Sequence, residues 1–203
     1  YFRVVVTSTL LETPCTASTN VVVVEVNYID QPIIDSDHVV CEGGDPNELF
    51  VLSGTEAFGD VSFQWQSASN NLGPWVNIPG ATAESYDPPP GLFNDTWYRL
   101  IVTSNAEDVA CFQVSEPVLV DVNSISPGLI TSPQTICEGE TPDPFEVEFE
   151  SVDGIIGYAW FVSNAVTGPF APVGSNQDTY APPAGLFENT YYQVEVSSTL
   201  NGE

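Results

Sequence analysis

The chain repeats itself with a period the size of a whole domain. Residues 1–27 align without a gap with residues 97–123, at an offset of 96 residues. Cys15 falls on Cys111 in this alignment, and the motif that begins at Cys41 returns at Cys137 with the same offset. Solenoid repeats are shorter, roughly 20–50 residues, so a period of this length indicates a string of folded domains. The sequence therefore predicts a modular, extended protein rather than an enzyme.

The same correspondence runs through the interior of the repeat. Trp65 matches Trp160, and Gly73-Pro74 matches Gly168-Pro169. We expect three parts. Residues 1–27 are the C-terminal hairpin of a truncated repeat, residues 28–123 are one complete repeat, and residues 124–203 are a repeat truncated before its last strand.

The local patterns predict an all-β fold without helices of ordinary length. Short segments rich in Val, Phe, Tyr, Trp and Thr are interrupted by Gly, Pro and Asn about every ten residues, which is typical of a β-sandwich. Val61, Phe63 and Trp65 alternate with polar residues, so one face of this strand is expected to be buried and the other wet. The seven strands expected in the complete repeat are 32–40, 48–54, 60–67, 74–78, 84–87, 96–104 and 109–122.

Trp65, in the third of these strands, resembles the core tryptophan of an immunoglobulin-like sandwich. We therefore expect tandem immunoglobulin-like β-sandwich repeats of about 96 residues. The linkers, residues 26–32 and 122–128, are short and contain Pro, so they are expected to bend little.

The charge of the chain excludes several classes of partner. It has 28 acidic and two basic residues, and its formal net charge is −26. Nucleic acid and anionic membrane surfaces need clustered Lys or Arg, which this chain lacks. No stretch approaches the roughly 20 apolar residues of a membrane span. The charge is explained by solubility of a surface-exposed fibre, while divalent cations, basic proteins and neutral glycans stay open as partners.

The four cysteines are placed periodically. We expect Cys41, at the start of the complete repeat, to pair with Cys111 in its last hairpin, which would stabilise the domain by roughly 3–4 kcal/mol. Cys15 would pair with a residue upstream, and Cys137 with an equivalent at position 205. Periodic pairs indicate an oxidising, extracellular location, whereas the alternative is small buried free thiols.

The motifs Cys-Glu-Gly at 41–43, Gly-Pro-Trp at 73–75, Tyr-Asp-Pro-Pro at 86–89 and Thr-Trp-Tyr-Arg at 96–99 resemble the immunoglobulin-like repeats of giant surface adhesins of Bacteroidota. The chain is most similar to the SprB-type gliding motility adhesins. The resemblance implies export by the type IX secretion system, attachment to the outer membrane at the bacterial cell surface, and movement by the gliding motor. It also implies neighbouring repeats, surface polysaccharide and gliding-motor or outer-membrane proteins as partners.

Two kinds of binding site can be considered. Ca²⁺ at a domain junction would use the carboxylates of Asp30, Asp35, Asp37 and Asp121, although this ion needs six to eight converging oxygens. Trp75 and Trp97 could stack on sugars, but the other repeats replace them by Phe170 and Tyr191, as core positions tolerate.

The basic residues Arg3 and Arg99 occupy the same place in two repeats. They are either ligand contacts or structural residues that stack on an aromatic ring or pair with a cross-strand acid. The structural interpretation is favoured because repetition at a strand position suits packing, and Gln193 replaces them in the last repeat.

No catalytic constellation is present in the sequence. His38 is the single imidazole and is not repeated, and no nucleophile elbow or metal-ligand motif occurs. We expect a non-catalytic, structural and adhesive stalk segment of a long extracellular filament, with no cofactor other than a candidate Ca²⁺. The alternative is a carbohydrate- or calcium-binding sandwich attached to a secreted protein.

Overall fold

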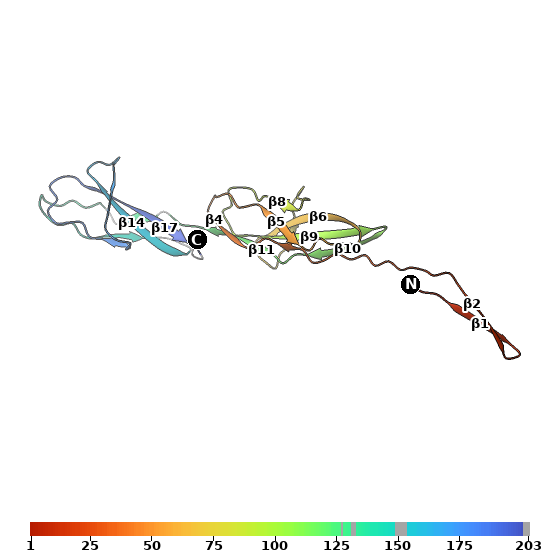
Figure 1. The fold of residues 1–203 in the computed structure, drawn as a ribbon. Coiled ribbons are helices and arrows are strands. Elements are labelled where there is room, and N and C mark those ends of the chain that lie inside the picture. Colours follow the sequence, from red (N-terminus) through yellow and green to blue (C-terminus); the bar gives the residue numbers. More distant parts are fainter. Residues whose placement is uncertain (127, 131–132, 149–153, 201–203) are drawn as a thin grey trace.

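The computed structural model describes residues 1–126, 128–130, 133–148 and 154–200. This part of the chain is all-β and contains no helix. Its strands form three groups that follow one another in a row, with the N-terminal segment (residues 1–27) at one end of the molecule (Figure 1). We call residues 28–123 the middle unit and residues 124–200 the C-terminal unit. No sheet among the described residues joins strands of two groups.

The N-terminal segment is a hairpin of β1 (Val5–Leu10) and β2 (Thr13–Ser18). The strands of the middle unit are β3 (Ile33–Ile34), β4 (His38–Cys41), β5 (Leu49–Ser53), β6 (Asp60–Ala68), β7 (Val76–Asn77), β8 (Ser85–Tyr86), β9 (Thr96–Ala106), β10 (Val109–Val114) and β11 (Val118–Asn123). Those of the C-terminal unit are β12 (Leu129–Ile130), β13 (Phe145–Glu148), β14 (Ile155–Ser163), β15 (Ala171–Val173), β16 (Thr179–Tyr180) and β17 (Tyr191–Thr199).

The middle unit has two sheets. The larger has the order β4-β11-β9-β6-β7, with β10 also paired to β9, and the smaller has the order β3-β5-β8. All of these pairs are antiparallel except β4 with β11. Apolar side chains of both sheets form one buried cluster, to which Leu49 contributes from the smaller sheet and Trp65 and Leu100 from the larger, all with no exposed surface. The unit is thus consistent with the expected β-sandwich.

Alternation along β6 and β9 explains which residues enter this core. Trp65 faces Leu100 across the pair and Phe63 faces Val102, so each strand presents every second residue to the same side. The indole Nε1 of Trp65 donates a hydrogen bond to the carbonyl of Ala83 at 3.1 Å. This bond satisfies the polar atom of a fully buried ring, which would otherwise be costly to bury.

Two of the expected strands are each divided in the structure. The segment 32–40 becomes β3 on the smaller sheet and β4 on the larger, and 109–122 becomes β10 and β11. The first break falls at Asp35–Asp37, where the chain crosses from one sheet to the other. The second falls at Ser115–Pro117, since proline cannot donate a ladder hydrogen bond.

The C-terminal unit repeats part of this arrangement. Its sheets β12-β13-β16 and β15-β14-β17 correspond in order to β3-β5-β8 and β7-β6-β9. Trp160 takes the place of Trp65, is 1% exposed, and donates its Nε1–H to the carbonyl of Gln177 at 2.9 Å. The core tryptophan and its backbone acceptor are therefore features of both units.

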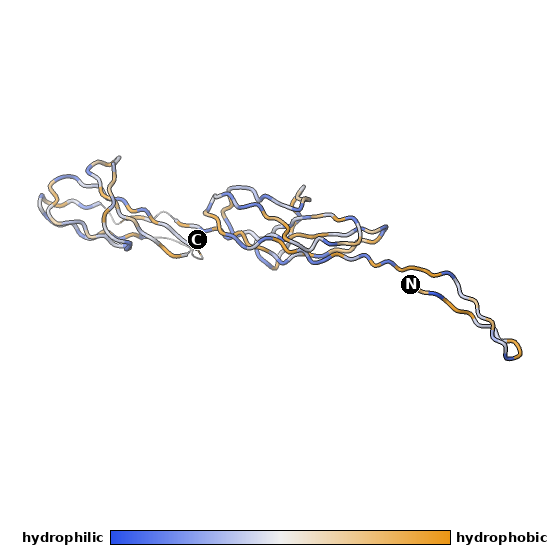
Figure 2. Tube along the Cα trace, in the orientation of Figure 1, coloured by the Kyte–Doolittle hydropathy of each residue, from blue (hydrophilic) through white to orange (hydrophobic). Residues whose placement is uncertain are grey.

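The hairpin of the N-terminal segment repeats the β9–β10 hairpin of the middle unit. Cys15 pairs with Ser8 across β1 and β2, as Cys111 pairs with Ser104 across β10 and β9. No second sheet among the described residues covers the N-terminal hairpin, so its valines are exposed, and Figure 2 shows several hydrophobic stretches along this segment.

Trp65→Ala is expected to destabilise the middle unit by about 3–5 kcal/mol, because it removes a fully buried ring and leaves a cavity. Calorimetry and circular dichroism during thermal unfolding measure this change. Leu72→Ala is the control, since Leu72 is 90% exposed and its loss should change stability by less than about 0.5 kcal/mol. Similar effects of the two substitutions would contradict the described core.

Tyr98 predicts a pH dependence of stability. Its side chain is 3% exposed, and burial, with the neighbouring Tyr86, raises the pKa of Tyr98 to about 12. The unfolded chain ionises near pH 10, so the stabilisation is fully present below pH 10 and is lost as the pH rises toward 12. The loss is roughly 2 kcal/mol, measurable by urea unfolding at stepped pH. Tyr98→Phe should flatten this decline, and an unchanged decline would refute the assignment.

Candidate functional site

The N-terminal segment meets the middle unit through the side chain of Asn27. Its Nδ2 donates hydrogen bonds to the carbonyls of Ser104 at 2.9 Å and Val109 at 2.8 Å. The hydroxyl of Ser104, a residue with no exposed surface, donates back to Oδ1 of Asn27 at 2.6 Å. One amide thus uses both ends to hold the β9–β10 hairpin of the next unit.

The same contact recurs between the middle and C-terminal units. Nδ2 of Asn123 donates to the carbonyl of Ser198 at 3.1 Å, and Oγ of Ser198 donates to Oδ1 of Asn123 at 2.9 Å. Asn27 and Asn123 are equivalent in the repeat, as are Ser104 and Ser198. We call this pair of reciprocal hydrogen bonds the Asn–Ser clamp. Its presence at both junctions indicates that the clamp is a feature of the repeat and is not specific to one junction.

The residues after Asn27 are folded into the middle unit. Ile29 is 7% exposed and belongs to the core cluster, and Pro32 is fully buried. The amide of Asp30 donates to Glu56 at 3.0 Å, and the carbonyl of Tyr28 accepts from Phe58 at 3.1 Å. The linker therefore leaves no free spacer between the clamp and the sandwich.

A glycine brings the backbone close to the clamp serine. The amide of Gly59 donates to Oγ of Ser104 at 2.9 Å, and a Cβ at Gly59 would collide with the carbonyl of Asn105. Gly154 of the C-terminal unit meets the carbonyl of Thr199 in the same way. Both units therefore use a residue without a side chain where this loop crosses the end of the hairpin.

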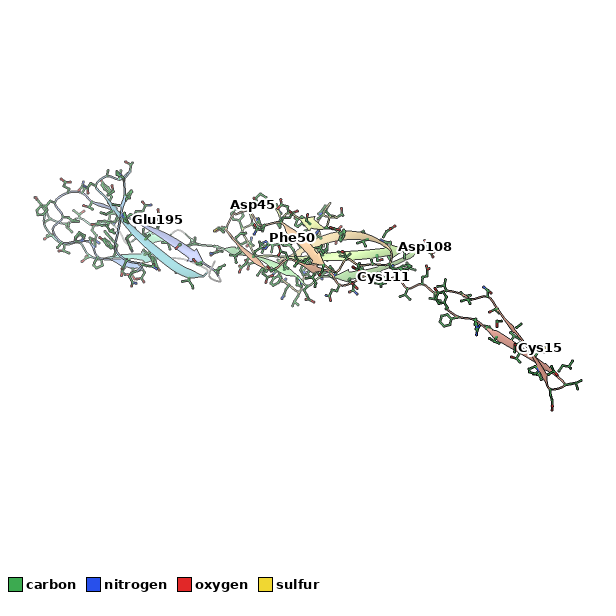
Figure 3. All side chains as sticks on the ribbon, viewed as in Figure 1. Cys15, Asp45, Phe50, Asp108, Cys111 and Glu195 are labelled. Atoms are coloured by element: carbon green, nitrogen blue, oxygen red, sulfur yellow. The ribbon has the colours of Figure 1, made fainter. Side chains whose placement is uncertain are left out.

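The predicted disulfide between Cys41 and Cys111 is wrong. Both thiols are free. Cys111 pairs with Ser104 near the far end of β9, whereas Cys41 lies beside Asn123, beyond the start of β9. About ten strand residues, roughly 30 Å, separate the two positions, whereas a disulfide needs Cα atoms within about 7 Å. Figure 3 shows Cys111 at the end of the middle unit that faces the N-terminal segment, and Figure 1 shows β4 at the opposite end.

Trp75 and Arg99 form one structural cluster on the outer face of the larger sheet. The guanidinium carbon of Arg99 lies 4.3 Å from the centre of the Trp75 ring, and its Nε donates to Oε1 of Gln66 at 2.7 Å. Gln66 in turn donates to Oδ1 of Asn77 at 2.6 Å and is 8% exposed. Burial also lowers the pKa of Arg99. The alternation along β6 predicts a solvent-exposed outer face, but Gln66 on this face is buried.

The C-terminal unit replaces this cluster as a group. Gln193 stands where Arg99 does, and Phe170 stands where Trp75 does. Phe161 pairs with Gln193, at the position where Gln66 pairs with Arg99. The arginine, its aromatic partner and its hydrogen-bond acceptor thus change together, as expected of residues that pack on one another.

The remaining candidate side chains, Trp97 and Arg3, lie in different parts of the chain. Trp97 is half-buried on β9, opposite Ala68 and Leu119. Arg3 is exposed in the N-terminal segment.

The four aspartates proposed for Ca²⁺ do not converge. The amide of Asp30 bonds to Glu56 near the N-terminal junction, whereas Asp121 lies on β11 opposite Val39 near the other junction. Asp35 caps its own turn by accepting from Ser36, and Asp37 accepts from the amide of Leu119 at 2.7 Å. Among the described residues no group of three or more acidic, His or Cys side chains could hold a metal ion. His38, on β4, has a buried Nε2 without a hydrogen-bond partner.

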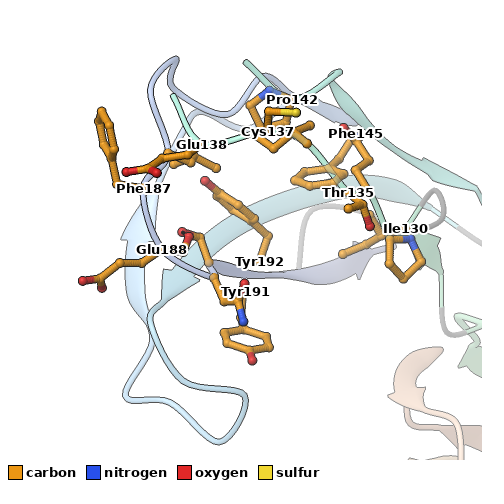
Figure 4. A pocket seen from close by; sticks show the side chains of 16 residues that line it. Ile130, Thr135, Cys137, Glu138, Pro142, Phe145, Phe187, Glu188, Tyr191 and Tyr192 are labelled. Atoms are coloured by element: carbon orange, nitrogen blue, oxygen red, sulfur yellow. Dashed lines mark hydrogen bonds between the residues drawn. The ribbon is translucent and has the colours of Figure 1, made fainter. Parts of the chain in front are cut away.

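A groove of about 770 Å³ lies on the C-terminal unit, between residues 133–138 and 186–192 (Figure 4). These segments align with 37–42 and 92–98 of the middle unit, and there β11 lies between β4 and the start of β9. The hydroxyl of Tyr192, which lines the groove, is buried without a hydrogen-bond partner. The groove therefore has the position that β11 occupies in the middle unit.

The middle unit is similar to a known family of domains. Residues 31–124 match the model of a family described as a domain of unknown function (DUF8696). The matched segment nearly coincides with the middle unit, residues 28–123. No curated protein gives a significant match. Among the described residues, no helix is long and apolar enough to cross a membrane.

The Asn–Ser clamp was missed by sequence reasoning, although its signal was present. Asn27 aligns with Asn123, and Ser8, Ser104 and Ser198 occupy one position of the repeat. Repetition of small polar residues at strand ends gives no indication of which partner they bond, because the partner lies in the neighbouring unit.

Arg99→Ala is expected to destabilise the middle unit by about 1–3 kcal/mol, since it leaves the buried Oε1 of Gln66 without its donor and uncovers Trp75. Urea unfolding followed by circular dichroism measures the loss. Arg3→Ala is the matched control, because Arg3 has the same place in the repeat but lies in the exposed N-terminal segment. A ligand-binding role without a structural one would leave both variants as stable as the parent chain.

Proposed function

We propose that this chain is a structural segment of a long extracellular filament at a bacterial cell surface, in which each repeat acts as a stiff spacer. The observation that carries the proposal is the recurrence of the Asn–Ser clamp at both junctions. A repeat that docks on its neighbour through the same contact each time places successive units in one fixed relation, which builds a rod. A module attached singly to an enzyme has no need of such a contact.

The charge supports this proposal. A net charge of −26 spread over an elongated chain keeps neighbouring chains apart and opposes folding back of one unit on another. Both terms act over about a Debye length, roughly 8 Å at physiological salt, so they complement the short-range clamp.

The adhesive part of the proposal concerns the surface of the rod. Its partners are neighbouring repeats, surface polysaccharide, and the proteins of the outer membrane and gliding motor that the adhesin resemblance implies. Arg99 lies over the Trp75 ring, and Trp97 is half-buried on β9 opposite Ala68, so both side chains take part in structural contacts. The spacer role is therefore the primary one in this proposal.

The spacer role predicts how length depends on the number of repeats. Chains with one, two and three additional copies of residues 28–123 inserted after Asn123 should grow in maximum dimension by equal increments in small-angle X-ray scattering. A rod gives linear growth because every junction has the same geometry. Flexibly linked units would instead grow roughly as the square root of their number. Square-root growth would contradict the proposal.

A glycan array tests the alternative of a carbohydrate-binding module. The spacer proposal predicts no specific signal that is lost in folded Trp75→Ala or Trp97→Ala variants. Specific binding that either substitution abolishes, with unchanged circular dichroism, would favour the binding module instead.

A further inference from the structure

We propose that a disulfide links successive repeats, between Cys41 of one repeat and the equivalent of Cys111 in the next. The inference rests on the tandem arrangement of the proposed function. It replaces the pairing within one repeat, which the strand order forbids. Each of the two junctions in this chain supplies one half of the geometry.

The N-terminal junction shows where the thiol of the following repeat lies. Sγ of Cys111 lies 3.5 Å from the backbone carbonyl oxygen of Asn27, the clamp residue of the preceding repeat. Cys111 is half-buried there, on the strand of the clamped hairpin. The thiol of the following repeat is thus held against the last residue of the preceding one.

The second junction shows where the cysteine of the preceding repeat lies. Cys41 ends β4 and pairs in parallel register with Asn123, the clamp residue of the middle unit. The amide of Glu42 donates to the carbonyl oxygen of Asn123 at 3.0 Å. Side chains of register partners in neighbouring strands point to the same side of a sheet. Cys41 therefore lies beside the asparagine that reaches into the next unit.

The two halves combine because Asn27 and Asn123 are equivalent and are clamped in the same way. The Cys111 thiol of the following repeat and the backbone amide of Glu42 would then both contact the carbonyl oxygen of the same asparagine. Sγ of Cys111 and the amide nitrogen of Glu42 would then be at most 6.5 Å apart, which is the sum of the two distances. Cys41 is exposed at its junction, so its thiol has room to turn toward this partner. This limit applies to Sγ of Cys111 and the amide nitrogen of Glu42; a disulfide also needs the two Cα atoms within roughly 4.4–6.8 Å of each other.

The chemistry is an ordinary oxidation of two thiols. The Sγ atoms of the two cysteines form one S–S bond and lose two protons and two electrons. A disulfide oxidant, such as oxidised glutathione or an oxidised dithiol catalyst, accepts them and is reduced to two thiols. The resulting bond would add a covalent connection across the same junction that the clamp holds by hydrogen bonds.

The test uses the full chain with residues 28–123 duplicated, that is, residues 1–123 followed by residues 28–203. In the bridging variant, Cys41 of the first copy and Cys111 of the second copy are kept, and every other cysteine becomes Ser. The reversed control keeps Cys111 of the first copy and Cys41 of the second. A third variant keeps Cys41 and Cys111 of the first copy only.

Each protein is equilibrated with a mixture of reduced and oxidised glutathione, and its free thiols are counted under denaturing conditions. Peptide mapping without reduction then identifies linked peptides. We expect the bridging variant to lose both thiols and to yield a Cys41–Cys111 peptide within a monomer. The reversed control and the third variant should keep theirs free or bound to glutathione. Retention of both thiols by the folded bridging variant, or equal linkage in all three, would overturn the proposal.

Scattering from the same samples separates this inference from the proposed function. An extended bridging variant without a disulfide would refute the cross-repeat bond and leave the rod intact. A compact or broadly distributed chain would refute the rod itself. Thermal unfolding of each variant verifies that the units are folded before thiols are counted.

Discussion

The structure depends on an asparagine amide that uses its donor and its acceptor at once. Here the amide satisfies both its donor and its acceptor because Ser104, near the end of β9, presents a carbonyl and a hydroxyl at fixed positions. Two hydrogen bonds donated by Asn27 and one that it accepts from Ser104 define its orientation on the hairpin as well as its distance, which a single apolar contact would not. The burial of Ile29 and Pro32 directly after the clamp then removes the slack that a linker normally provides.

The sandwich and its joints rest on different physical terms. Within a unit, burial of Trp65, Leu100 and their neighbours supplies the hydrophobic stabilisation, and paired backbone groups complete the sheets. Across a joint the contacts are polar and small, so hydrogen-bond geometry sets the arrangement. The arginine cluster belongs to the first category, since Arg99 covers Trp75 and satisfies Gln66 on a face that would otherwise be open to water.

Much of the fold was predictable from the sequence, because strand periodicity is local. The alternation in β6, the core role of Trp65 and the all-β class all follow from residues a few positions apart. The cysteine pairing was not predictable, since it depends on strand order. The segment 32–40 changes sheet at Asp35–Asp37, which places β4 beside β11 and carries Cys41 to the end opposite Cys111. The aspartates were misplaced for the same reason, as closeness in sequence to a linker does not determine which junction a side chain faces.

The central claim, a fixed relation between successive units, is tested most directly by a distance distribution across one junction. Spin labels at Ser62→Cys on β6 and Glu195→Cys on β17, both exposed positions, in a chain with all four native cysteines changed to Ser, would report it by double electron–electron resonance. We predict one narrow distribution that broadens when Asn123→Ala removes the clamp. A broad distribution in the chain with Asn123 intact, unchanged by the substitution, would contradict the account.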